Sequence, residues 1–273
     1  MTAGIVYRVP ATRLAGWSGE PVIVRVDDVA GLATVCVDPP AGLVHLEMPL
    51  SPQTAGELAG WRGGAPIDFR LADPANDYPL LYACSPLVDY APVRITIPVV
   101  EGFGRAVRLA VSLQLPVRLQ IGQPGPEPID ELAEVLSRFL HGSTVAVPVE
   151  PFQGVLNALL RGEPFSLWAI AEDDPALFRE VDALGEERLP VRLGGARLAA
   201  SGEDQAGAVA ARFAGDGECR ACPFAKGCLG YFKWPDPGYS CAGIREVLDR
   251  LSAAADELRA DLAAFDELAA GDR

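Results

Sequence analysis

Short apolar runs alternate with segments of helical periodicity between residues 92 and about 172. Strands are expected at Val93–Val100, Val117–Ile121, Val145–Val149 and Ser166–Ile170. Helices are expected between them at Phe103–Leu115, Ile129–Leu140 and Phe152–Leu160. Strands that alternate with helices of this length need crossover connections, so they indicate a parallel sheet. The pattern predicts an α/β fold, either a partial barrel or an open parallel sheet.

The first 91 residues are expected to be richer in strands. Gly, Pro and Asp separate short strand candidates at Ile5–Val9, Pro21–Val26, Leu32–Val37 and Ile67–Leu71. A helix is expected at Ser51–Trp61, because Ser51 can cap it and Pro52 suits its first position. We therefore divide the chain into a β-rich region (1–91), an α/β region (92–213) and a cysteine-rich module (214–273).

The C-terminal residues predict a long helix. After a shorter expected helix at Asp204–Phe213, apolar residues recur at steps of four and three along one face, at Ile244, Leu248, Leu251, Ala255, Leu258, Leu262 and Phe265. This is the a/d pattern of a helix seam. Such a helix packs on its own core, or it contacts a second copy of the chain or another partner.

Composition and charge narrow the class of protein. The 273 residues are 49% hydrophobic and 22% charged, as expected for a globular protein. The net charge of -14 opposes binding to phosphate backbones, so nucleic acid is not an expected partner. The N-terminus lacks the apolar core of a signal peptide, and no apolar run approaches the about 20 residues of a membrane span. We expect a cytoplasmic protein without a membrane partner.

Four of the six cysteines lie within 23 residues, at Cys219, Cys222, Cys228 and Cys241. A Cys-x2-Cys pair brings two thiolates to one site, and two further thiolates complete a closed ligand set. The intervening Pro and Gly residues suit a loop wrapped around an ion. Apolar cover for the site is expected from Phe224, Tyr231, Phe232, Trp234 and Tyr239. Cys36 and Cys84 each stand alone among apolar residues and are predicted to be buried, inert thiols.

Three kinds of cysteine site fit these residues. Disulfides are disfavoured in the cytoplasm. A structural zinc ion fits four thiolates, although such sites often pair two Cys-x2-Cys knuckles and this chain has one. An iron-sulfur cluster is the preferred prediction.

The spacing Cys-x2-Cys-x5-Cys with a later fourth cysteine resembles the SPASM domain, the C-terminal auxiliary-cluster module of radical S-adenosylmethionine (SAM) enzymes. These enzymes modify ribosomally made peptides and proteins. The resemblance implies a SPASM/twitch-like module with one auxiliary 4Fe-4S cluster on Cys219, Cys222, Cys228 and Cys241. In the full family pattern another cysteine follows the third after three residues, and here that position is Phe232.

A larger departure from the family concerns catalysis. Radical SAM enzymes hold their reactive cluster through Cys-x3-Cys-x2-Cys, and this sequence has no such triplet. The expected function is therefore an accessory protein rather than an enzyme. It would bind a peptide substrate or a radical SAM enzyme, while its cluster relays electrons or stabilises the fold. Lys226 and Lys233 lie inside the cysteine segment and either tune the cluster and dock a partner or are solvated surface charges.

Two alternatives remain open. One is a structural zinc protein. The other is a redox enzyme with its active site in residues 1–213, for which Asp27–Asp28 and Glu172–Asp173–Asp174 are acidic candidates or else solvated loop carboxylates. The two histidines, His45 and His141, suggest no histidine-rich site, and His141 suits a structural role at a helix end.

Overall fold

The computed structural model describes residues 4–15, 17, 19–143, 145–194 and 217–271. The described strands form a nine-stranded sheet in the order β7-β6-β5-β4-β3-β2-β1-β8-β9, with β7 and β9 as its two edges. All neighbours are parallel except β8 and β9. The predicted α/β fold with a parallel sheet is confirmed, and the sheet does not close into a barrel. The strands are β1 Val6–Pro10, β2 Val22–Arg25, β3 Leu43–Leu50, β4 Ile67–Leu71, β5 Val93–Pro98, β6 Val117–Gln120, β7 Val149–Glu150, β8 Phe178–Val181 and β9 Glu187–Arg188.

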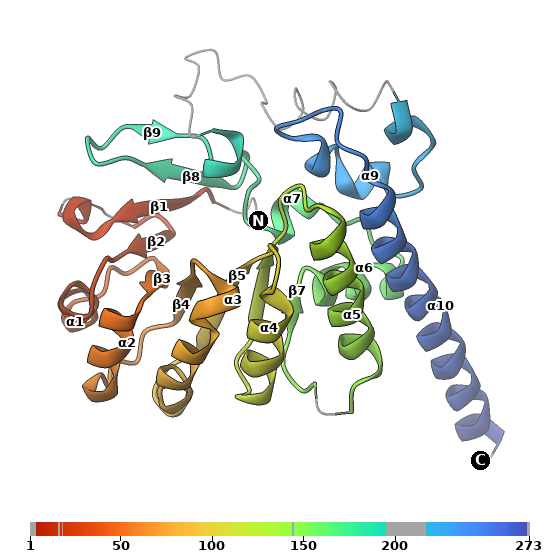
Figure 1. The fold of residues 1–273 in the computed structure, drawn as a ribbon, viewed down its shortest axis with the longest axis horizontal. Helices are drawn as coiled ribbons and strands as arrows, with labels where there is room; N and C mark the ends of the chain where they lie inside the picture. The colour runs from red at the N-terminus through yellow and green to blue at the C-terminus, as the bar shows by residue number, and fades with distance from the viewer. Residues whose placement is uncertain (1–3, 16, 18, 144, 195–216, 272–273) are drawn as a thin grey trace.

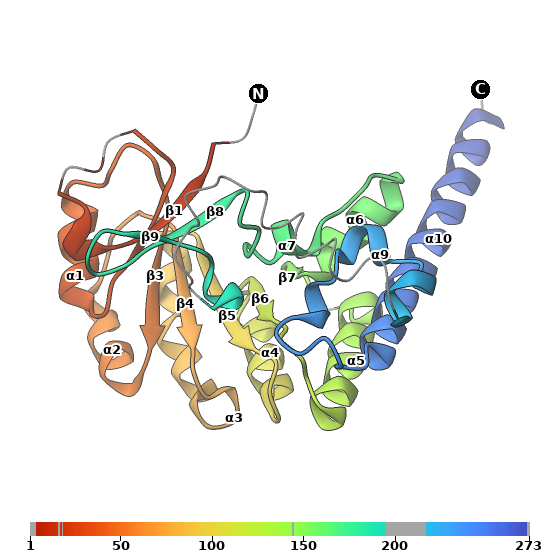
Figure 2. The ribbon, with the colours of Figure 1, turned by 90° about the horizontal axis from the view of Figure 1, so that it is seen from above.

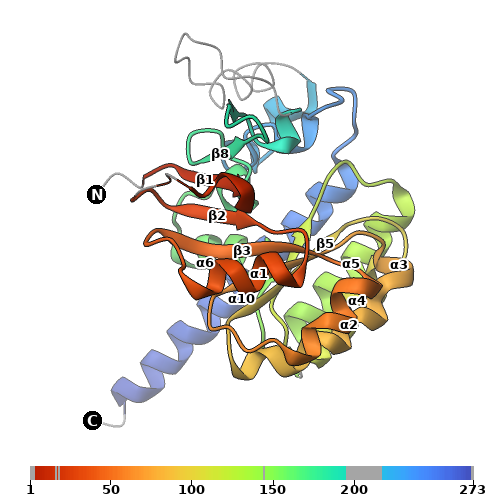
Figure 3. The ribbon, with the colours of Figure 1, turned by 90° about the vertical axis from the view of Figure 1, so that its left-hand side faces the viewer.

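Helices cover one face of this curved sheet (Figures 1 and 2). Because each strand from β1 to β7 pairs with the next one in the chain, the connecting helices fall on the same side. Viewed toward the β1 end, the helices lie below the strands and the cysteine segment lies above them (Figure 3). The helices are α1 Val29–Val37, α2 Pro52–Glu57, α3 Pro74–Asp77, α4 Phe103–Ser112, α5 Pro126–His141, α6 Phe152–Arg161, α7 Leu167–Ile170, α9 Ala225–Cys228 and α10 Ala242–Gly271.

The two faces of the sheet carry different residues. On β3, β4 and β5 the apolar residues alternate with polar ones, as the two-residue period of a strand requires. The helix-covered face is apolar and includes Leu46, Phe69 and Ile95, all fully buried. The opposite face carries charged residues, among them Glu47 and Asp68, and these are buried too. A large hydrophobic core therefore lies between the sheet and its helices, and a polar layer lies on the other side.

The strand predicted at Leu32–Val37 is wrong, because these residues belong to α1. The Asp28 side chain caps this helix and accepts a hydrogen bond from the Gly31 backbone N–H at 2.7 Å. Leu32 and Val35 face the core. A cap and burial of one helix face override the strand preference of the β-branched residues. The strand that follows, β3, was not predicted, because His45 and Glu47 interrupt its apolar pattern.

The strand predicted at Ser166–Ile170 is also wrong. Ser166 caps the short helix α7 by accepting a hydrogen bond from the Ala169 N–H at 3.3 Å. The strand predicted at Val145–Val149 shortens to β7. The helix expected after Ser51 is confirmed as α2 with its Ser51 cap, whereas the helix expected at Asp204–Phe213 lies outside the described residues.

The long helix α10 packs against α5 and α6 and then continues past the body of the protein (Figure 1). Ile244, Leu248, Leu251 and Ala255 are buried, so the first half of the predicted seam faces the protein's own core. Leu258, Leu262 and Phe265 are exposed. Contact with a second copy through this second half stays a prediction.

Among the described residues, no helix combines the length and the apolar composition that crossing a membrane requires.

We predict that Leu251→Ala lowers the free energy of unfolding by about 2–5 kcal/mol, because the side chain is 1% exposed and its loss leaves a cavity. The matched control Leu262→Ala, at a side chain 55% exposed, should change it by less than about 0.5 kcal/mol. Urea denaturation of both variants measures this. Equal losses would mean that the second half of α10 is also covered in solution.

Candidate functional site

The four clustered cysteines surround one cavity. Cys219 lies in a 3-10 turn, Cys222 follows that turn, Cys228 ends α9, and Cys241 directly precedes α10. All four line a cavity of about 50 Å³ together with Phe232 and residues of the first turns of α10. The spacing predicts that the four cysteines form one ligand set, and that role stays a prediction. The cysteines are all partly buried and free.

Aromatic side chains attach the cysteine segment (residues 217–241) to segments that connect the strands and helices. The Tyr231 hydroxyl donates a hydrogen bond to Asp173 at 2.9 Å, and the Tyr239 hydroxyl donates to the Pro124 carbonyl at 2.9 Å. The Trp234 indole N–H donates to the Arg192 carbonyl at 2.6 Å. Of the five aromatic residues expected to cover the site, Phe232 lines the cavity, whereas these three hold the segment in place.

The cysteine sulfurs have distinct surroundings. Burial raises the pKa of Cys228, whose sulfur accepts hydrogen bonds from the backbone N–H groups of Phe232 and Tyr231. Burial raises the pKa of Cys241 to about 12, against the opposing charge of Lys233. Burial therefore favours the protonated thiols of Cys228 and Cys241.

The two lysines of the segment differ. Lys226 is exposed, which agrees with the alternative that it is a solvated surface charge. Lys233 is buried and pairs with Glu218, which also accepts a hydrogen bond from the Cys241 backbone N–H at 2.9 Å. The positive charge of Lys233 is stabilised there by Glu218 and by the sulfurs of Cys219 and Cys241. The structure thus places one fixed positive charge beside the cysteines.

The sulfurs are spread around the cavity. Within the part of the chain that the structure describes, the one set of three Cys, His, Asp or Glu ligand atoms that all lie within 4.8 Å of one another is His45, Glu47 and Glu172. No three cysteine sulfurs are that close together. The remaining cysteines lie elsewhere: Cys84 is fully buried, as predicted, whereas Cys36 is half-buried.

A second group of polar residues fills the face of the sheet that the helices leave uncovered. We call this the charge cluster; it consists of Arg8, Glu47, Asp68, Arg94, Arg118, Glu172 and Glu180. Arg94 donates two hydrogen bonds to Asp68, at 3.0 and 2.7 Å. Arg118 lies 3.1 Å from Asp68 as well, and its Nε donates to Thr96. Buried charges are stable only when they are paired in this way.

Glu172 is the centre of the charge cluster. It lies on the crossing segment (residues 162–177), which leads from α6 to β8 and thus from one end of the sheet toward the other. Its carboxylate accepts hydrogen bonds from Arg8, Arg94 and Arg118, on strands β1, β5 and β6. Its backbone has a φ of 60°, a left-handed conformation that costs a non-glycine residue about 1–2 kcal/mol. The three ion pairs hold it there.

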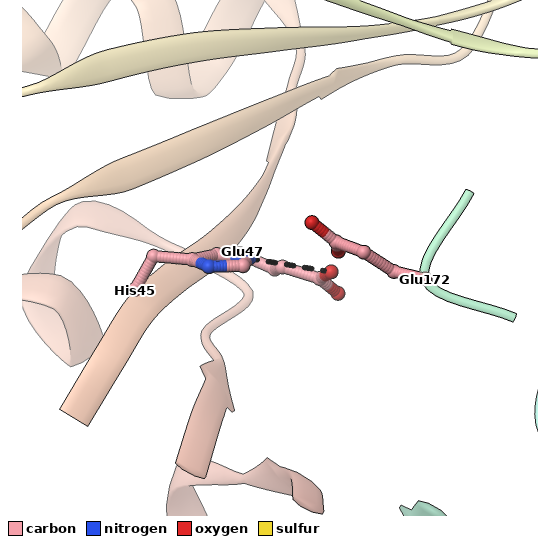
Figure 4. Close-up of side chains that lie close together, drawn as sticks. All are labelled: His45, Glu47 and Glu172. Carbon is pink, nitrogen blue, oxygen red and sulfur yellow. Dashed lines mark ion pairs between the residues drawn. The ribbon is translucent and has the colours of Figure 1, made fainter. Parts of the chain in front are cut away.

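His45, Glu47 and Glu172 also have the ligand types of a divalent metal site (Figure 4). Arg8 donates to Glu47 at 3.2 Å, and Arg94 lies 3.4 Å from His45 and donates to Glu172 at 2.7 Å. These arginines already supply positive charge where a metal would lie. A metal ion would have to displace them, so we assign this group to the charge cluster.

Arginine contacts set the protonation of the charge cluster. Burial opposes ionisation of Glu172, but Arg118 and Arg94 outweigh it and lower the pKa of Glu172 to about 2. The pKa of Glu47 is likewise held well below its usual value, since His45, Arg8 and Arg118 outweigh burial. Burial dominates at Asp173 and Glu180 and raises the pKa of both.

The acidic candidates from the sequence have separate places. Glu172 and Asp173 are in buried contacts rather than solvated loops, whereas Asp174 accepts a hydrogen bond from the Ala176 N–H at 2.8 Å in a turn. Asp28 caps α1, and Asp27 lines a cavity at the strand ends. His45 belongs to β3, and His141 ends α5.

Sequence reasoning missed the charge cluster as a unit. Its signal is present in the chain: Arg8, Glu47, Asp68, Arg94 and Arg118 are charged positions inside strand segments. Both faces of a parallel sheet are normally covered, so charges within its strands call for buried partners.

Comparison of the chain with family models, with curated proteins and with solved structures found no match. The SPASM resemblance therefore stays a prediction from the cysteine spacing.

We predict that Glu172→Gln lowers the free energy of unfolding by about 3 kcal/mol at pH 7, because three arginines lose a charged partner. The pKa of Glu172 is about 2 in the folded protein and about 4.3 in an unfolded chain, so ionisation stabilises the fold above pH 4.3. This contribution is lost as pH falls from there to 2.

Denaturant titrations at several pH values check this. The difference between wild type and variant should shrink as pH falls from about 4.3 to 2. The exposed Glu163→Gln is the control and should match wild type throughout. A difference that does not vary with pH would mean that the ionised carboxylate of Glu172 is not what stabilises the fold.

Proposed function

We propose that Cys219, Cys222, Cys228 and Cys241 hold a single 4Fe-4S cluster, and that the protein is an accessory relative of the radical SAM/SPASM enzymes. The observation that carries the proposal is the convergence of all four cysteines on one cavity walled mainly by apolar atoms. Such clusters are bound by four thiolates and lie among apolar residues that exclude water.

The distances among the sulfurs favour a cluster over zinc. Four thiolates around one zinc ion lie about 2.3 Å from it, and hence about 3.8 Å from one another. No three of these sulfurs lie within 4.8 Å of one another. A cubane binds each thiolate through a different iron, which spreads the ligands further apart. A structural zinc site would need the loop to contract.

The residues around the sulfurs fit an electron-transfer role. When bound, an all-thiolate cluster supplies one-electron transfer and offers no open iron to a substrate. The N–H groups of Tyr231 and Phe232 donate to the Cys228 sulfur, and Lys233 places a positive charge beside Cys219 and Cys241. Hydrogen bonds to the sulfurs and nearby positive charge are among the ways in which a protein raises the reduction potential of a cluster.

An accessory role is favoured over catalysis at the centre of the sheet. The sequence has no Cys-x3-Cys-x2-Cys triplet. The charge cluster fills the uncovered face, and the cavity among Arg8, Glu47, Arg118 and Glu180 is about 40 Å³, which is too small for a substrate. The proposed partner is a radical SAM enzyme or a ribosomally made peptide in the cytoplasm, and the cluster relays electrons to it or stabilises the fold.

The second candidate is a redox enzyme with its active site in residues 1–213. A cavity of about 500 Å³ at the strand ends favours it. Turnover of a substrate by the isolated protein would establish this candidate in place of the accessory role.

Anaerobically purified protein should contain about four irons and four sulfides per chain and absorb broadly near ~400 nm. Cys222→Ala should lose most of its iron and sulfide, because one of the four ligands is removed. Cys36→Ala is the matched control and should retain them, since Cys36 lies outside the cavity. Iron, sulfide and zinc analyses with an absorption spectrum measure this; one zinc per chain without visible absorbance would contradict the proposal.

Lys233→Met should lower the reduction potential of the bound cluster by roughly 30–60 mV, about 1 kcal/mol for one electron. The reason is that a buried positive charge beside two ligand cysteines is removed. Lys226→Met removes an exposed lysine of the same segment and should shift the potential much less. A redox titration of both variants measures it, and equal shifts would contradict a specific role for Lys233.

A further inference from the structure

A cavity of about 500 Å³ lies at the carboxyl ends of the central parallel strands. Residues at the ends of β2, β3, β4, β5 and β6 form its walls. Its polar lining consists of Arg25, Asp27, Glu47, Arg70, Thr96 and Gln120. The volume is in the range of small-molecule sites, and the carboxyl edge of parallel strands is where α/β proteins bind ligands. It is separate from the cysteine cavity, with which it shares no lining residue.

Glu47 gives this cavity a buried group without a hydrogen-bond partner. The residue is 2% exposed. Its Oε1 accepts a hydrogen bond from Arg8 at 3.2 Å, whereas its Oε2 is buried and accepts none. A buried carboxylate oxygen without a hydrogen bond is unfavourable, because nothing replaces the hydrogen bonds it would make with water. A ligand that donates a hydrogen bond to Oε2 would remove this penalty.

Arg70 lies close to that oxygen, and it is loosely held. Its Nη1 lies 3.7 Å from Glu47 Oε2, which is beyond hydrogen-bond distance. The side chain is 42% exposed, so it can turn toward a ligand. Arg25 is already engaged, since it donates to the Val181 carbonyl at 2.7 Å and pairs with Glu180 at 3.2 Å. Arg70 is thus the group available for an anion.

Glu47 and Arg70 together favour a ligand that carries both a positive and a negative charge. A cation alone would pair with Glu47 and leave Arg70 without its partner, and an anion alone would leave Glu47 Oε2 unsatisfied. A zwitterion replaces one long ion pair by two charge-assisted hydrogen bonds and leaves the net charge unchanged. The cavity also has apolar walls from Val26, Met48 and Leu71, which suit an apolar side chain.

We propose that this cavity binds the ammonium and carboxylate of an apolar amino acid, either free or as a short peptide. Glu47 Oε2 accepts from the ammonium, and Arg70 donates to the carboxylate. The site goes beyond the proposed cluster function and does not depend on it, because its residues lie on other elements.

Isothermal titration calorimetry on the full chain tests the proposal, with L-leucine and L-phenylalanine as probes. Leucinamide lacks the carboxylate and 4-methylpentanoate lacks the ammonium, so each should bind at least tenfold more weakly than leucine. The dipeptide Leu-Leu separates the two sources: tighter binding than leucine assigns the site to a peptide, and weaker binding assigns it to a free amino acid. If none of the probes binds at millimolar concentration, or if leucinamide or 4-methylpentanoate binds as tightly as leucine, the proposal fails.

Variants assign the contacts. Arg70→Gln should weaken leucine binding at least tenfold and leave leucinamide binding unchanged. Arg62→Gln is the control, because Arg62 is exposed and lies before β4, at the amino-terminal ends of the strands rather than the carboxyl ends that form the cavity. Glu47→Gln should weaken the binding of leucine but not that of 4-methylpentanoate. Circular dichroism checks that this variant folds. If Glu47→Gln does not fold, Arg70→Gln still tests the site. Equal binding by Arg70→Gln and wild type would overturn the assignment.

Discussion

The carboxylate of Glu172 joins three strands that are far apart in the sequence. It accepts hydrogen bonds from Arg8, Arg94 and Arg118, and its backbone carbonyl accepts a fourth from Arg8 at 3.0 Å. The crossing segment that carries it connects the two ends of the sheet. Helices cover the other face, and these hydrogen bonds hold the crossing segment on the polar face. The left-handed backbone of Glu172 persists because the surrounding ion pairs outweigh its cost.

The same segment connects the sheet to the cysteine site. Asp173 accepts a hydrogen bond from Tyr231, and Trp168 donates to the Leu229 carbonyl at 3.1 Å. Arg192 stacks on the Tyr231 ring at 3.6 Å from its centroid and donates to the Tyr231 carbonyl at 2.7 Å. Tyr231 in turn donates through its backbone to the Cys228 sulfur. The geometry around Cys228 therefore depends on contacts with the crossing segment and with Arg192 as well as on the loop itself.

The cysteine cavity and the cavity at the strand ends differ in their chemistry. The cysteine cavity is walled mainly by apolar atoms and lies against the start of α10, where a cluster would be shielded from water. The strand-end cavity is lined by both charges and by apolar side chains. The charge cluster fills the sheet face and contributes Glu47 to the strand-end cavity, whereas it contributes no residue to the cysteine cavity. Two cavities of different chemistry thus coexist on one fold without sharing a lining residue.

The sequence by itself determined the parallel α/β fold and most strand positions, because these follow from local periodicity, and its cysteine spacing brought four cysteines of a short segment to one cavity. Ser51 and Pro52 were enough to predict the start of α2. Only the tertiary structure decided that Leu32–Val37 is helical, that Lys233 is buried against Glu218, and that Glu172 meets Arg8, Arg94 and Arg118. The partners of Glu172 are 54 to 164 residues away, and a strand pattern shows which positions are polar without showing which charges pair. Pairing depends on how the crossing segment returns over the sheet, which only the folded chain defines.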